Sequence, residues 1–100
     1  MSPNNDIVEE YIFEGIDDFH AWISVGDAWM ISEPLTMFHE AFMNINKGCG
    51  CGKKKRWKKV ETFYKELPAL ISGDTALDLR RSARAKRIIF KLDGKAVGSF

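Results

Sequence analysis

The N-terminal third of this 100-residue chain holds one clear helical pattern and one ambiguous apolar stretch. Phe19, Trp22 and Ile23 follow the spacing i, i+3, i+4, which predicts a short helix that ends near Gly26. The five apolar residues between positions 7 and 13 fit either a short helix or a strand. Apart from the one helix, the sequence leaves the conformation of residues 7–31 open.

Two longer helices are predicted from apolar stripes. Ser32 is a suitable N-cap for a helix that ends near Asn46, where a glycine-rich stretch begins. A third helix should run over residues 53–71, and Pro68 should kink or terminate it. The stripe residues are Leu35, Phe38, Phe42 and Ile45 in the first of these helices, and Trp57, Val60, Phe63, Tyr64 and Leu67 in the second.

The C-terminal third predicts a fourth helix and a β-hairpin. A turn at residues 72–74 can cap a helix over 75–85, and Asp93-Gly94 between two apolar runs is a strong hairpin signal. The expected fold class is α+β, mostly α, with about four helices and a C-terminal hairpin in one domain of residues 1–100. Its parts are a polar leader (1–6), an acidic helical half (7–46), a Gly/Cys turn (47–52), basic helices (53–86) and the hairpin (87–100).

Charge is segregated along the chain. Residues 1–46 contain nine acidic residues and no Lys or Arg, whereas residues 47–100 contain all 15 basic residues and five acidic ones. The two segments therefore carry formal charges of −9 and +10, although the whole chain carries only +1. Such a chain can neutralise itself within one fold, attract further copies of itself, or bind a polyanion with its basic half.

The basic run at the start of the third helix is the strongest binding candidate. It places six cations around one Trp at a helix N-terminus, where the helix dipole favours acids instead. A polyanion would compensate this, with DNA or RNA phosphate as the first candidate, an acidic neighbouring subunit as the second and anionic lipid as the third. A solvated lysine face is the alternative. The run consists of Lys53, Lys54, Lys55, Arg56, Trp57, Lys58 and Lys59.

The order of the last elements also resembles a winged helix-turn-helix. The fourth helix, with Arg80, Arg81 and Arg84, would then enter the major groove, and Lys91 and Lys95 would touch phosphate from the wing. Base-reading Asn and Gln are absent from residues 73–87, so this pattern favours contact with the DNA backbone. The arginines could equally cover a solvent-exposed helix side.

Enzyme chemistry finds little support in the sequence. No Ser-His-Asp order, phosphate-binding glycine loop or carboxylate pair beside a base is present. No apolar run is long enough to cross a bilayer, and the first six residues lack the features of a signal peptide. We therefore expect no enzymatic activity, no cofactor, no small-molecule substrate and no membrane partner.

Residues 47–56, Lys-Gly-Cys-Gly-Cys-Gly-Lys-Lys-Lys-Arg, resemble a Cys-Gly-Cys stretch followed by lysines in small proteins of tailed bacteriophages, including marine ones. The resemblance implies a virion structural protein, made in the host cytoplasm, such as an accessory subunit of the capsid or head–tail connector. Its expected partners are other virion proteins or copies of itself, with DNA backbone as a further contact. The alternative hypothesis is a winged-helix DNA-binding regulator of the phage.

The two cysteines are expected to be reduced and free of metal. Their one-residue spacing does not match structural zinc sites, although Cys49 and Cys51 with His39 form an alternative ligand set. Replacing both cysteines by Ser should lower the free energy of unfolding by no more than about 2 kcal/mol. A metal assay on the purified protein tests this: stoichiometric zinc, lost together with folding in the double variant, would contradict the expectation.

Overall fold

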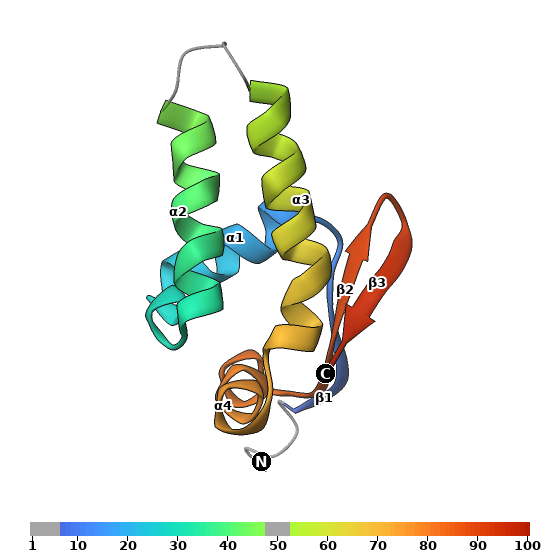
Figure 1. Ribbon diagram of the computed structural model, residues 1–100. Coiled ribbons are helices and arrows are strands. Elements are labelled where there is room, and N and C mark those ends of the chain that lie inside the picture. Colours follow the sequence, from blue (N-terminus) through green and yellow to red (C-terminus); the bar gives the residue numbers. More distant parts are fainter. Residues whose placement is uncertain (1–6, 48–52) are drawn as a thin grey trace.

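The computed structural model describes residues 7–47 and 53–100 of the chain (Figure 1). Its fold is α+β and mostly α, as the sequence predicts. The elements are β1 (Val8–Phe13), α1 (Ile16–Val25), the short 3₁₀ helix η2 (Ala28–Met30), α2 (Glu33–Lys47), α3 (Lys53–Leu70), α4 (Gly73–Ala83), β2 (Ala85–Leu92) and β3 (Lys95–Ser99).

A three-stranded sheet joins the two ends of the described chain. β2 and β3 form the predicted hairpin, in which Asp93 and Gly94 take φ of 54° and 82°, as a tight two-residue turn requires. β1 pairs with β2 in parallel, so the strand order is β1-β2-β3. The apolar stretch that the sequence left open is thus a strand, and the segment expected to be an acidic helical half begins with β1.

The predicted boundary between the fourth helix and the hairpin is wrong by two residues on each side, and the helix also begins at Gly73 instead of Thr75. The fourth helix ends at Ala83 rather than 85, and β2 begins at Ala85 rather than 87. Arg84 explains both, because it adopts the left-handed conformation (φ 53°) and its N–H caps carbonyls of the last helical turn. The Arg84 carbonyl then accepts a 2.8 Å hydrogen bond from the N–H of Val8, so pairing with β1 extends β2 backwards.

An aromatic cluster forms the centre of the core. Phe13 and Phe90 lie opposite each other on β1 and β2, with ring centroids 5.6 Å apart, and Phe19 packs within 5.0 Å of Phe13 and 4.8 Å of Phe90. Tyr64 completes the cluster from α3, and its hydroxyl donates a 3.2 Å hydrogen bond to the carbonyl of Phe13. One buried group of rings therefore ties the sheet to α1 and α3.

The helices bury most of the predicted apolar stripes, and their arrangement makes the molecule elongated. Leu35, Phe38, Phe42 and Ile45 of α2 are all buried, as are Val60, Tyr64 and Leu67 of α3. α2 and α3 run side by side in opposite directions, and α4 lies at the far end of α3 (Figure 1). The molecule is elongated, with principal extents of 53 × 26 × 25 Å.

Pro68 lies within α3, which continues to Leu70 instead of ending at the proline. Its ring packs against Gly98 of β3 so closely that a Cβ added at Gly98 would lie 2.6 Å from Cγ of Pro68. Gly98 is therefore the position that lets the hairpin approach α3.

Gly98→Ala is expected to lower the free energy of unfolding by about 1–3 kcal/mol, because the added methyl group must displace β3 or a rigid proline ring. Urea denaturation followed by circular dichroism measures the change. Gly26→Ala is the matched control: its φ of −107° suits alanine and no atom lies within 4 Å of the added Cβ. Equal losses in the two variants would contradict the packing, and adding Pro68→Ala should recover part of the Gly98→Ala loss.

Candidate functional site

The structure divides the predicted binding residues between two surfaces at opposite ends of α3 (Figure 1). α3 has 18 residues and is therefore about 27 Å long, and the two surfaces lie toward its opposite ends. Lys53 and Lys54 begin α3, but their side chains lie outside the described part of the structure. The first surface, called the tip surface below, consists of the exposed side chains of Lys55, Arg56, Lys58 and Lys59.

Part of the compensation for cations at this helix start comes from within the chain. α2 runs antiparallel to α3, so the negative end of the α2 dipole lies beside the positive end of α3. The Arg56 guanidinium donates a 3.3 Å hydrogen bond to the carbonyl of Asn44, in the last turn of α2. Arg56 and Lys59 also line a hollow of about 250 Å³ between the two helices, together with Ala41 and Asn44.

Trp57 does not join the lysines around it on the solvent side. It is half-buried, and its ring meets that of Phe42 edge-on at 5.9 Å, so it packs α3 against α2. Lys59 instead places its ammonium 5.8 Å from the ring centroid of Phe63. The described part of the tip surface is therefore a set of exposed cations without an exposed aromatic ring for base stacking.

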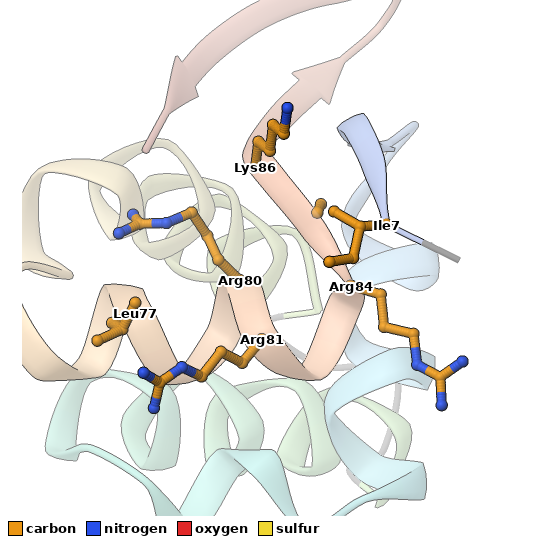
Figure 2. A pocket seen from close by; sticks show the side chains of 7 residues that line it. Ile7, Leu77, Arg80, Arg81, Arg84 and Lys86 are labelled. Carbon is orange, nitrogen blue, oxygen red and sulfur yellow. The ribbon is translucent and has the colours of Figure 1, made fainter. Parts of the chain in front are cut away.

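The second surface is a pocket of about 530 Å³ between α4 and the start of β2, called the α4–β2 pocket below. Figure 2 shows that the ends of its cationic side chains spread around the pocket and do not converge on one point. A small phosphate would be held by converging donors, so this arrangement suits a larger anionic surface. The pocket is lined by Ile7, Leu77, Arg80, Arg81, Arg84, Ala85 and Lys86.

Four of these lining residues, Ile7, Leu77, Ala85 and Lys86, were not predicted as site residues. Leu77 lies one turn before the predicted arginines on α4, Lys86 comes from the start of β2, and Ile7 reaches the pocket because β1 pairs with β2. Ile7 is 53% exposed and Leu77 37% exposed, so the pocket presents apolar surface between its cations. The sequence shows that these residues are apolar, but it does not show the long-range strand pairing that brings Ile7 to the pocket.

α4 presents a mixed surface to solvent. Asp74 and Asp78 are exposed one turn apart, and Arg81 follows on the same side. A recognition helix in the major groove would bring both carboxylates close to DNA phosphates. The hairpin turn at Asp93-Gly94 lies at the far end of β2 from α4 (Figure 1), so the predicted wing and recognition helix are on different parts of the molecule.

β1 carries acidic residues of the first half of the chain to the basic second half. The Lys86 ammonium lies 3.0 Å from a Glu9 carboxylate oxygen, and Glu10 pairs in register with Arg87. Both side chains of the ion pair are exposed, so it contributes little to stability. The two charged halves thus meet along the sheet, as expected if they neutralise each other within one fold. The cations of the tip surface remain exposed to solvent.

His39, which the sequence offers as an alternative metal ligand, forms a hydrogen-bonded pair with His20 in the structure. His20 Nε2 lies 3.0 Å from His39 Nδ1, so one ring donates a hydrogen bond to the other. The pair is stacked between Phe42, 3.8 Å from the His20 ring centroid, and Trp29, 4.5 Å from that of His39. Burial and the neighbouring His39 lower the pKa of His20 below 6.5, and Asp17 acts in the opposite direction.

The predictions on Cys49 and Cys51 fall outside the described residues. Among residues 7–47 and 53–100, no group of three or more His, Cys, Asp or Glu side chains is placed to hold a metal ion. No helix in those ranges has both the length and the apolar character needed to cross a bilayer.

The chain matches no protein-family model, no curated protein and no solved structure.

The histidine pair predicts a pH dependence of stability. Because the folded-state pKa of His20 lies below 6.5, the unfolded chain binds the proton more tightly, and the folded protein loses stability as the pH falls below about 6.5. Chemical denaturation at a series of pH values between about 5 and 8 measures this, with Trp29 fluorescence as a local probe. His20→Gln should reduce the dependence, and an unchanged profile in that variant would assign the effect to other groups.

Proposed function

We propose that this protein is a small structural subunit of a phage virion that works by contacts and does not catalyse a reaction. The observation that carries the proposal is the separation of the tip surface from the α4–β2 pocket along an elongated molecule. A subunit that joins neighbours needs surfaces on different sides, whereas an enzyme gathers its reacting groups at one place. The resemblance of residues 47–56 to small phage proteins supports the class of particle.

The tip surface is proposed to touch the backbone of packaged DNA. Its four described cations are exposed, and their sequence spacing places them within two turns of α3. Lysine ammoniums on flexible stems suit phosphates whose positions vary with the DNA sequence, because they act as point charges. Trp57 packs inward against Phe42, so the proposed contact is electrostatic and independent of base identity.

The winged-helix regulator is the second candidate, and the order α3–α4–β2–β3 favours it. In that case, DNA binding would depend on Arg80, Arg81 and the wing lysines instead of the tip surface. Asp74 and Asp78 on the exposed side of α4 and the apolar lining of the pocket argue against this assignment. The two candidates therefore predict different DNA-binding residues in the same fold.

Replacing Lys55, Lys58 and Lys59 by Gln is expected to weaken binding to duplex DNA, because three cations near phosphate are lost. The slope of log K against log salt concentration should fall in magnitude by about 2 to 3. Fluorescence anisotropy with a labelled duplex at several salt concentrations measures the slope. Because the replaced side chains are exposed, the free energy of unfolding should change by less than about 0.5 kcal/mol per substitution.

The matched control replaces Arg80, Arg81 and Lys95 by Gln, which removes the same number of charges. It should retain the slope of the original protein, and the opposite result would favour the winged-helix candidate. Mass spectrometry of purified particles, from a phage that encodes the chain, tests the virion assignment itself. Stoichiometric presence in the particles is expected, and absence from them would reject the assignment.

A further inference from the structure

We propose that the α4–β2 pocket binds a second copy of this chain through an exposed acidic and apolar surface around η2 and the start of α2. The inference rests on the proposal that the protein works by contacts between subunits, and it names the partner for one of its two surfaces. The surface offered by the second copy is called the acidic corner below. It consists of Val25, Asp27, Met30, Ile31, Glu33, Met37 and Glu40.

The pocket has the composition of a protein contact surface. Ile7 and Leu77 are exposed, and exposed Val8 lies next to Ile7 in the chain. Arg80, Arg81, Arg84 and Lys86 also line the pocket, although Lys86 is already paired with Glu9, and no acidic residue of the described ranges 7–47 and 53–100 lines it. A nucleic-acid backbone would satisfy the cations but leave the apolar side chains without a partner. A protein surface that is both apolar and acidic satisfies both.

The acidic corner has the complementary composition. Val25 and Met30 are 89% and 65% exposed, the two highest values among the large apolar residues of the described chain, and Met37 is 45% exposed. No Lys or Arg occurs before position 47, so no cation of the corner's own segment opposes its carboxylates. Glu33, Met37 and Glu40 lie at i, i+4 and i+7, which puts two carboxylates and a flexible apolar side chain on one face of α2.

Both surfaces lie near α4. Ser82 of α4 lines a second hollow, of about 280 Å³, together with Val25 and Gly26 from the end of α1. The corner and the pocket are therefore near neighbours on one molecule. Two copies related by a twofold axis could then make the same contact twice, which is the arrangement of most small homo-oligomers.

Sedimentation equilibrium of the purified full chain without DNA tests the proposal. The protein should self-associate at about 0.05 M NaCl and dissociate progressively toward about 0.5 M, because salt screens the exposed charges. Arg80→Glu with Arg81→Glu should weaken self-association about tenfold or more, since repulsion replaces attraction. Glu33→Lys with Glu40→Lys should weaken it similarly from the other side of the contact.

Mixing the two reversed variants provides the decisive measurement. Each variant alone should be mainly monomeric, and the mixture should form a heteromeric complex because every reversed charge then faces an opposite one. Lys55→Glu with Lys58→Glu is the control that reverses two cations outside the pocket, and it should self-associate like the original protein. Thermal unfolding of each variant confirms that it is folded before its association is measured.

The outcomes separate this inference from the proposed function. A protein that stays monomeric at low salt, or a mixture that forms no complex, would overturn the assignment of a second copy to the pocket. If Arg80→Glu with Arg81→Glu abolishes DNA binding and leaves self-association unchanged, the pocket binds nucleic acid instead. DNA binding through Lys55, Lys58 and Lys59 is measured in a separate experiment, so the proposed function is not decided by the result on self-association.

Discussion

The parallel pairing of β1 with β2 is the constraint on which the rest of the structure depends. It places Phe13 opposite Phe90, and the rings of Phe19 and Tyr64 close around this pair. The Tyr64 hydroxyl bonds to the Phe13 carbonyl, and burial, with the charge of Asp18 as a smaller cause, raises the pKa of Tyr64. Because a parallel pair cannot be closed by a hairpin, the chain between the two strands must cross over the sheet, and its helices do so.

The same pairing determines where charge is neutralised and where it is not. β1 brings Glu9 to Lys86 and Glu10 to Arg87, so the two oppositely charged halves meet at the sheet. The α2–α3 pair extends away from that junction and carries the tip surface to the other end of the molecule (Figure 1). Among the described residues no charged side chain is buried, and the buried Tyr64 hydroxyl is satisfied by the Phe13 carbonyl. The charges are thus left on the surface, where they are available for contacts.

Local sequence patterns were sufficient to predict the helices and the hairpin, because the hydrogen bonds of these elements join residues that are close in the chain. The apolar stripe ending at Ile45 predicts a helix by its spacing alone, and Asp93-Gly94 predicts a tight hairpin turn by its residue types alone. β1 could not be assigned in this way, since its six residues become a strand only through a partner more than 70 residues away. Arg84 is similar: a left-handed arginine ends α4 where glycine would be the usual choice.

The candidate site was predictable in its residue types and not in its grouping. The basic run and the arginines of α4 were visible as charge, but the length of α3 separates them into two surfaces. Ile7 joined the second surface through the pairing of β1 with β2, and His20 met His39 through the packing of α1 near α2. Trp57, which the sequence placed both in the apolar stripe of the third helix and in the basic run, packs α3 against α2.

β1 lies parallel to β2 and holds the acidic and basic halves of the chain together. Nuclear Overhauser contacts in the isotope-labelled full chain test it most directly. The parallel register predicts backbone contacts between Ile12 and Ile89 and between Glu10 and Arg87, together with ring contacts between Phe13 and Phe90. If residues 8–13 show no contact with residues 85–92 while the β2–β3 hairpin remains intact, the pairing of β1 with β2 is contradicted.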